Sequence, residues 1–260
     1  MSFRIAVPKN KIFSKLYSNN EFITNNPKIS LIMVDEKDIY SFLWGEKVDL
    51  ALMSPLSYSQ GVVNSDFRII NAPSLSVEGY SALASIFFNR GLKSINSVIS
   101  SNNNDFLIQI GKIMLAEKFD LQIDMKYQKG NTGELLQQFD CVIDWNNEDN
   151  RFESLDITEE WFDNFEIPLP LCFWVCKADS YPEGIDKIPA YLADPLLDDE
   201  EIINDLELAT ALENEYDPRQ GRLIWKMDDD FEHNLSQVLQ LLYFHQLIDN
   251  IGAVKLFNRD

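Results

Sequence analysis

Polar side chains that could hold a small molecule follow four segments that we expect to be strands. Two such groups follow the first and third strands of the chain, and two follow strands of a second set beginning near residue 97. Open parallel sheets bind ligands beyond the C-terminal ends of their strands. We therefore expect eight residues to line one cleft: Lys9, Asn10, Ser54, Ser57, Asn102, Asn103, Asp144 and Trp145.

Two of these groups also open predicted helices. Free N–H groups and a partial positive charge at a helix N-terminus attract anions, so a carboxylate could be held without an arginine cluster. Ordinary N-capping by Ser54 and Asn104 explains the same residues, and capping and ligand binding can coexist. Asp144 suits either a turn or the cleft. Trp145 could cover a flat ligand ring or belong to the core.

The familiar catalytic signatures do not occur in this sequence. It has no glycine-rich dinucleotide or phosphate loop, no Gly-x-Ser-x-Gly and no His-Glu-x-x-His. His233 and His245 lie twelve residues apart on one predicted helix, about 120° apart around its axis, so they do not share a face. We expect neither a metal site nor an organic cofactor.

The net charge narrows the class of partner. At −20, the chain would repel nucleic acid and anionic lipid over most of its surface, so neither is an expected partner. More than half of this charge lies between Asp194 and Glu232, where fourteen carboxylates and three cations give −11. We interpret this segment as solvated helical faces, with a protein-binding patch as the alternative.

Cysteine usage and the N-terminus suggest a reducing compartment. Three cysteines do not form a disulfide framework, and Cys172 and Cys176 on one strand would have α-carbons about 13 Å apart. Residues 1–8 carry no signal-peptide core, and no segment reaches the roughly 18 apolar residues of a membrane span. We therefore expect a cytoplasmic protein.

Alternating strand and helix patterns predict an α/β protein with mainly parallel sheets, helices on both faces and a helical C-terminal closure. Two long apolar segments, 80–88 and 168–176, are candidates for strands that cross between domains. We expect a discontinuous first domain of residues 1–78 and 178–260, with residues 79–177 inserted. The remainder after 177 is predicted to be helical and to end in an amphipathic helix, 230–248.

A family resemblance emerges from segments spread in order along the chain. They are Asp49 to Tyr58, Phe67 to Ile70, Ser74 to Gly79, Ile113 to Phe119, Leu155 to Trp161, Leu169 to Val175, Leu239 to Leu247 and Val254 to Phe257. Together they resemble the chorismate dehydratases of menaquinone biosynthesis by the futalosine pathway. The resemblance implies a two-lobed, type 2 periplasmic-binding-protein-like fold.

It also implies a function: binding a small anionic carboxylate metabolite in the interdomain cleft. The lyase hypothesis is the dehydration of chorismate to 3-enolpyruvyl-benzoate, in which Asn10, Ser54 and Asn102 would orient the substrate and stabilise developing charge. Lys9, Ser57, Asn103, Asp144 and Trp145 would complete the ligand contacts. The turns depart from the family pattern, which favours the alternative, a non-catalytic solute-binding or sensor protein.

Overall fold

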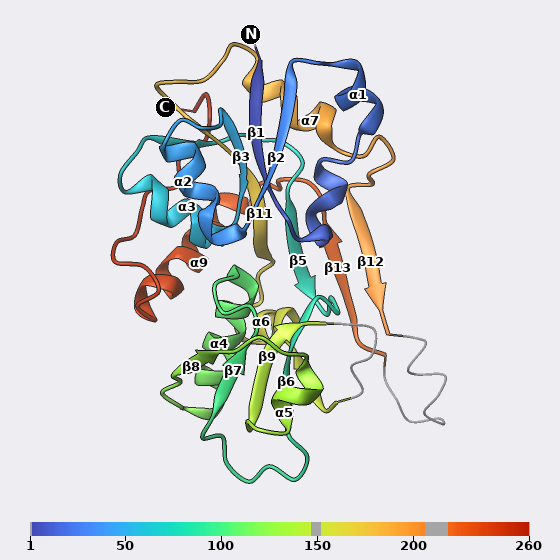
Figure 1. The fold of residues 1–260 in the computed structure, drawn as a ribbon, viewed down its shortest axis with the longest axis vertical. Coiled ribbons are helices and arrows are strands. Elements are labelled where there is room, and N and C mark those ends of the chain that lie inside the picture. Colours follow the sequence, from blue (N-terminus) through green and yellow to red (C-terminus); the bar gives the residue numbers. More distant parts are fainter. Residues whose placement is uncertain (1, 147–151, 206–217, 260) are drawn as a thin grey trace. The chain divides into compact units, whose positions relative to one another are not determined.

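The computed structural model describes residues 2–146, 152–205 and 218–259. It divides the chain into two compact units: residues 1–76, 169–201 and 224–260 form unit 1, and residues 77–168 and 202–223 form unit 2. The boundary falls inside three strands, β5 (Leu75–Gly79), β12 (Glu200–Asn204) and β13 (Gln220–Ile224). Figure 1 labels all three.

Unit 1 begins with the predicted strand and helix alternation. β1 (Phe3–Pro8) lies between two parallel neighbours, β2 (Ile29–Val34) and β3 (Leu50–Met53). The eight-stranded sheet has the order β12-β13-β5-β11-β3-β1-β2, and β4 (Phe67–Ile69) pairs with β11 (Leu169–Lys177). Strand β11 runs antiparallel to both β3 and β4, so this sheet also contains antiparallel pairs.

The helices of unit 1 are mostly short. They are η1 (Lys11–Leu16), α1 (Asn20–Asn25), η2 (Glu36–Asp38), α2 (Ile39–Trp44), α3 (Pro55–Val62), η3 (Ile185–Lys187), α7 (Ile188–Leu192) and α9 (Phe231–Phe244). The predicted apolar stripe of α9 is confirmed: Leu235, Val238, Leu239 and Leu242 are all fully buried. Helix α9 packs on β11 and α3, with Phe231 edge-on to Phe173 at 5.3 Å between ring centroids.

Unit 2 contains a five-stranded sheet in the order β10-β6-β9-β7-β8. Its strands are β6 (Ala84–Phe88), β7 (Val98–Ser100), β8 (Met125–Tyr127), β9 (Cys141–Trp145) and β10 (Ser154–Asp156). The helices among its described residues are α4 (Phe106–Phe119), α5 (Thr132–Leu136) and α6 (Ile157–Phe165). The β7, β8 and β9 strands run parallel as predicted, whereas β6 is antiparallel to both β9 and β10.

Three expectations need correction. Strand β11 belongs to unit 1 because it pairs with β3 and β4, so residues 169–177 are not part of the inserted unit. Residues 202–223 belong to unit 2, whereas the sequence pattern assigned all residues after 177 to the first domain. The segment after 177 is not wholly helical, since β12 and β13 are strands: Ile202 and Ile203 are β-branched, a residue type that favours extended backbone over helix.

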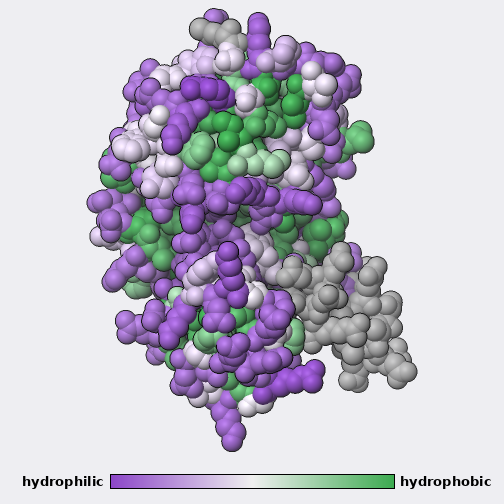
Figure 2. All heavy atoms as spheres, viewed as in Figure 1, coloured by the Kyte–Doolittle hydropathy of each residue, from purple (hydrophilic) through white to green (hydrophobic). Residues whose placement is uncertain are grey.

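No helix within the described ranges is long and apolar enough to cross a membrane. Figure 2 shows one face on which hydrophilic side chains predominate, with smaller apolar patches among them. The three cysteines are buried and free, and Cys172 and Cys176 lie on the single strand β11, as predicted.

Candidate functional site

The first group of candidate residues lies in unit 1, where β1, β2 and β3 end side by side. Lys9 follows β1, and its backbone N–H donates to Val34 O at 3.1 Å, at the end of β2. Its ammonium lies 3.0 Å from a carboxylate oxygen of Asp35, and both side chains are more than half exposed. Asn10 caps η1 by accepting from the N–H of Ile12 at 3.2 Å.

Two buried serines complete this unit 1 strand-end cluster. Ser54 caps α3 through its Oγ, which accepts from the N–H of Ser57 at 3.3 Å. The Ser57 hydroxyl donates to Glu36 O at 2.8 Å, which joins the end of β3 to that of β2. The Ser57 hydroxyl proton is therefore already used in a hydrogen bond to the backbone, whereas the Ser54 hydroxyl donates to no other described residue. Of the two, Ser54 keeps a donor for a ligand.

A buried tyrosine supports the end of β1. The Tyr17 hydroxyl donates to Pro8 O at 3.0 Å, one residue before Lys9. Burial raises the pKa of Tyr17 to about 12, with a smaller effect from Cys172, so the phenol stays protonated at neutral pH. This bond fixes the direction in which the chain leaves β1.

The second group lies in unit 2, at the ends of β7 and β9. One oxygen of the Asp144 carboxylate accepts from Asn102 Nδ2 at 2.6 Å and from the N–H of Trp145 at 2.9 Å. The other accepts from the hydroxyl and the N–H of Ser101. Asn102 also donates to Ser101 Oγ at 2.9 Å. We call these four residues, Ser101, Asn102, Asp144 and Trp145, the Asp144 cluster.

The Asp144 cluster is a scaffold for the turn that opens α4. Asp144 is 4% exposed and its carboxylate already accepts four hydrogen bonds. The Trp145 indole donates to Asp105 Oδ2 at 2.8 Å, so the ring is held in position by the residue that precedes α4. The turn therefore has a fixed shape, while Asp144 has little capacity left for direct contact with a ligand.

The structure thus brings the eight predicted residues into two groups, one in each unit. Lys9, Asn10, Ser54 and Ser57 form the first, and Asn102, Asn103, Asp144 and Trp145 form the second. Asn103 follows Asn102 in the turn, and its carbonyl accepts from the Gln109 side chain of α4. Asn104 is exposed, and Asp105 takes the N-cap position that the sequence assigned to Asn104. Asn147, which follows Trp145 and Asn146 in the same predicted turn, lies outside the described residues.

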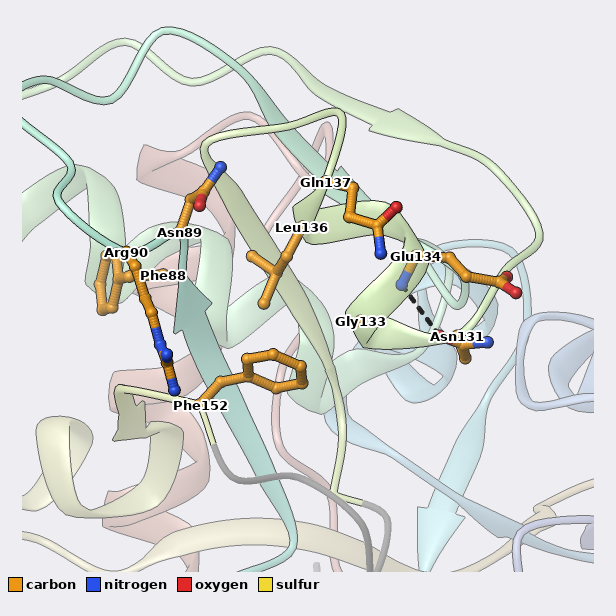
Figure 3. A pocket seen from close by; sticks show the side chains of 9 residues that line it. All are labelled: Phe88, Asn89, Arg90, Asn131, Gly133, Glu134, Leu136, Gln137 and Phe152. Carbon is orange, nitrogen blue, oxygen red and sulfur yellow. Dashed lines mark hydrogen bonds between the residues drawn. The ribbon is translucent and has the colours of Figure 1, made fainter.

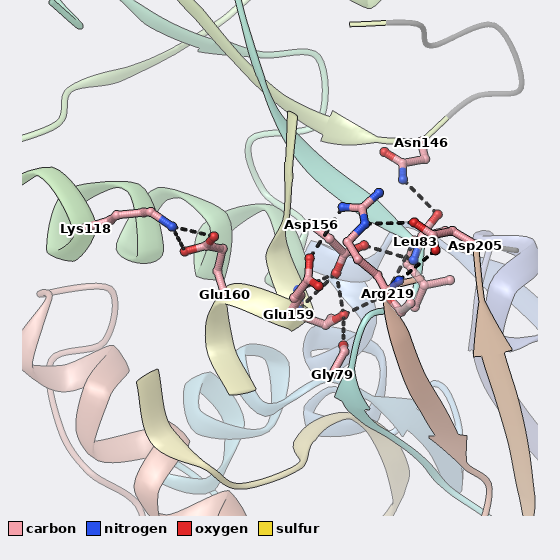
Figure 4. A network of polar contacts seen from close by, with 12 residues as sticks. Gly79, Leu83, Lys118, Asn146, Asp156, Glu159, Glu160, Asp205 and Arg219 are labelled. Carbon is pink, nitrogen blue, oxygen red and sulfur yellow. Dashed lines mark hydrogen bonds and ion pairs between the residues drawn. The ribbon is translucent and has the colours of Figure 1, made fainter. Parts of the chain in front are cut away.

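A polar network that the sequence did not indicate also lies in unit 2. Asp156, before α6, accepts from the N–H groups of Ala82, Thr158 and Glu159 at 2.9–3.0 Å (Figure 4). Burial raises the pKa of Asp156, and its hydrogen bonds oppose that rise. Its donors are mostly backbone groups, whose contribution cannot be recognised from residue types along the chain.

Arg219 extends this network. Its guanidinium lies 3.0 Å from Asp205 and 3.4 Å from Glu159, and 4.3 Å above the ring of Tyr80. Burial raises the pKa of Glu159; the nearby Arg219 opposes this rise, and Asp156 adds to it. These contacts join Asp205 to Arg219, and Arg219 to Glu159 and Tyr80, all of which belong to unit 2.

Metal sites in proteins are built from clusters of His, Cys, Asp and Glu side chains. No group of three or more such side chains within the described ranges could hold a metal ion. The two histidines lie at opposite ends of α9, His233 in its first turn and His245 at its C-cap. Neither belongs to the two groups of candidate residues.

No protein-family model and no curated protein matches this sequence. Solved structures do match its fold. The periplasmic aliphatic sulphonate binding protein SsuA of Escherichia coli is 12% identical, with a TM-score of 0.62, over 100% of this chain and 94% of that one. Protein AF1704 of Archaeoglobus fulgidus is also 12% identical, with a TM-score of 0.56, over 95% and 98%.

A third structure is the alkanesulfonate-binding protein SsuA of Xanthomonas axonopodis pv. citri bound to MOPS. It is 11% identical, with a TM-score of 0.54, and the match covers 97% of this chain and 96% of that one. The predicted fold class is therefore confirmed: the chain has a periplasmic-binding-protein-like fold. At these identities the comparisons establish the fold alone.

Proposed function

We propose that this protein binds a small organic anion, a carboxylate, through the strand-end residues of both units. The observation that carries the proposal is Ser54, a buried serine that caps the eight-residue helix α3 at the end of β3 and keeps its hydroxyl proton available. A carboxylate there would meet this hydroxyl, the positive end of α3 and the ammonium of Lys9. The sulfonate ligands named for the two SsuA proteins are small organic anions of comparable chemistry.

In this proposal the two groups of residues have different roles. Unit 1 supplies Lys9 and the positive end of α3, whereas unit 2 supplies two carboxylates, Asp144 and Asp105. Like charges repel, so the anionic end of the ligand contacts unit 1. Asp144 acts by holding Asn102 and Ser101 in the turn that opens α4.

The finer form of the proposal is a lyase. Chorismate would lose its ring hydroxyl and a ring hydrogen as water, and would become 3-enolpyruvyl-benzoate as the ring becomes aromatic. Asn10, Ser54 and Asn102 would orient the substrate and stabilise the developing negative charge, without metal or organic cofactor. The ordered resemblance across both units supports this form. The Asp144 carboxylate and the Ser57 hydroxyl already form hydrogen bonds within the protein, so neither is free to act on a substrate. This supports the alternative, a non-catalytic solute-binding or sensor protein.

Ser54→Asp gives a sharp test of anion binding. Aspartate caps a helix as well as serine does, so α3 is retained, but its charge would repel a carboxylate. A thermal-shift panel of small carboxylates and sulfonates, including chorismate, should show a ligand that stabilises the wild type, because a ligand bound only to the folded state raises the melting temperature. Ser54→Asp should lose that shift. Asn19→Asp, at the cap of α1, should keep it.

Turnover separates the two forms of the proposal. Purified protein with chorismate and a chelator should form 3-enolpyruvyl-benzoate if the chain is a lyase, and replacing both histidines by glutamine should leave most of the rate. Ser54→Ala or Asn102→Ala should lower the rate by roughly a hundredfold. Binding without turnover would establish the solute-binding alternative, and a panel with no stabilising anion would refute the proposal.

A further inference from the structure

Unit 2 contains a pocket away from the Asp144 cluster. It has a volume of about 570 Å³ and lies beside α5 and the end of β6 (Figure 3). The end of β6 pairs with the start of β9, as in the register Phe88 with Cys141, whereas Asp144 lies near the opposite end of β9. This pocket is therefore separate from the strand-end residues assigned above, and its size falls within the usual range for small-molecule sites.

The floor of the pocket is apolar and continuous with the core. Leu136 is 5% exposed and belongs to a buried cluster with Phe87 and Val142, against which Phe152 packs. Phe88 is partly buried at the edge and meets Phe119 edge-on at 6.3 Å. Two aromatic rings and a leucine thus offer a surface for a flat apolar group.

One cation lies on the rim. Arg90 is exposed, and within the described ranges it forms no ion pair. In Figure 3 its side chain extends along Phe88 toward Phe152, whereas the carboxylate of Glu134 points away from Phe152. The remaining polar side chains on the rim are amides, including Gln137. Arg90 and Glu134 are the charged residues that line the pocket, and of the two only Arg90 extends toward Phe152.

A glycine keeps the pocket open. Gly133 lies in α5 with ordinary helical backbone, and a β-carbon there would come within 3.2 Å of the Phe152 ring. Gly133 is the second residue of the five-residue helix α5, on the side that faces Phe152. The absence of a side chain at this position therefore leaves space beside the Phe152 ring.

We propose that this pocket is a second small-molecule site, which takes an aromatic monocarboxylate. The carboxylate pairs with Arg90, which can bind it in a bidentate manner, and the ring lies over Leu136 and Phe152. One ion pair and one ring on an open surface give a dissociation constant on the order of 1 mM. Such a site would add to the anion binding proposed for the strand ends, and does not depend on it.

Benzoate is the probe, measured by amide NMR titration of isotope-labelled protein. We expect saturable shifts in the wild type, weaker binding by at least about tenfold in Arg90→Gln, and no saturable binding in Gly133→Leu, whose side chain fills the pocket. Lys93→Gln, which removes a nearby exposed cation outside the pocket, should bind like the wild type. Benzamide, the neutral analogue, should bind at least about tenfold more weakly than benzoate.

The variants also separate this site from the first one. Ser54→Asp should leave benzoate binding to the pocket unchanged, even if it abolishes anion binding at the strand ends. Circular dichroism must show Arg90→Gln and Gly133→Leu to be folded. The proposal is overturned if benzoate gives no saturable shifts, if it binds both of these folded variants as it binds the wild type, or if benzamide binds equally well.

Discussion

Asp144→Asn tests whether the buried carboxylate of unit 2 is a scaffold. The side chain keeps its shape, but one oxygen becomes an NH₂ group that cannot accept. If that group replaced the oxygen that binds Asn102 and Trp145, two good hydrogen bonds of 2.6 and 2.9 Å would be lost. If the NH₂ group replaced the other oxygen, the Ser101 hydroxyl could rotate and accept a hydrogen bond from it. Only the Ser101 N–H, at 3.4 Å, would then lose its partner. We therefore expect the amide nitrogen to face Ser101.

These hydrogen bonds determine how much free energy of unfolding each Asp144 variant should lose. Hydrogen bonds to charged groups contribute about 1.5–3 kcal/mol each, and one weak bond is lost while another reverses direction, so Asp144→Asn should cost about 1–2 kcal/mol. Asp144→Ala removes all four acceptor contacts and leaves part-buried donors unpaired, so it should cost about 3–5 kcal/mol. The order of the two variants follows from the hydrogen bonds alone, because both remove the same charge.

Hydrogen exchange measured by mass spectrometry gives the assay, since it reports the opening free energy of β7 and β9 separately from unit 1. Asp124→Asn is the matched control: it removes an exposed carboxylate of unit 2 that forms no ion pair with a described residue. The reasoning fails if Asp144→Asn costs as much as Asp144→Ala, or if both remain within about 0.5 kcal/mol of Asp124→Asn.

Three further changes test packing and charge in unit 1. Gly61→Ala would place a β-carbon 2.0 Å from the buried Phe67 ring, so urea titration should show a loss of about 1–3 kcal/mol. Leu239→Ala, in the fully buried stripe of α9, should cost about 2–5 kcal/mol in the same titration. Burial and then Asp230 raise the pKa of Asp228, so its ionisation destabilises the fold as pH rises from the ordinary carboxyl range through that raised pKa. Asp228→Asn should therefore raise the melting temperature at pH 7 but not at pH 4, and equal effects at both would contradict this account.

The sequence predicted elements whose pattern is local. Strands β1 and β3 end directly before Lys9 and Ser54, residues predicted to follow strands. The closing helix α9 is shorter than predicted but buries the predicted stripe, because a period of 3.6 residues is visible without tertiary information. The acidic composition of residues 200–204 predicts a solvated helical face, yet these residues form an edge strand. Edge strands tolerate charged side chains, so composition alone does not distinguish the two structures.

For the candidate site, the sequence predicted the location of the residues but not their hydrogen-bond partners. The rule that polar residues follow parallel strands placed Asn102 beside Asp144, and the two are hydrogen-bonded. It could not indicate that Asp144 is saturated, because two of its four bonds come from backbone N–H groups. Nor could it indicate the bond between Trp145 and Asp105, which depends on how α4 leaves its turn. Residue types predict where a site forms, and only the folded backbone determines which atoms remain available.

The pairing of Lys9 with Asp35 yields a last prediction about anion binding in unit 1. The two side chains are 59% and 55% exposed, so their 3.0 Å ion pair contributes at most about 1 kcal/mol. A carboxylate arriving at Ser54 would compete with Asp35 for the same ammonium and would be repelled by its charge. Asp35→Asn should therefore strengthen anion binding about two- to fivefold at low salt, and the gain should shrink near 1 M salt, where charges are screened within about 3 Å. Asp38→Asn, an equal change of charge in η2, should alter the affinity less. If Asp35→Asn weakens binding instead, Asp35 itself contacts a donor group of the ligand, and the ligand is not a simple anion.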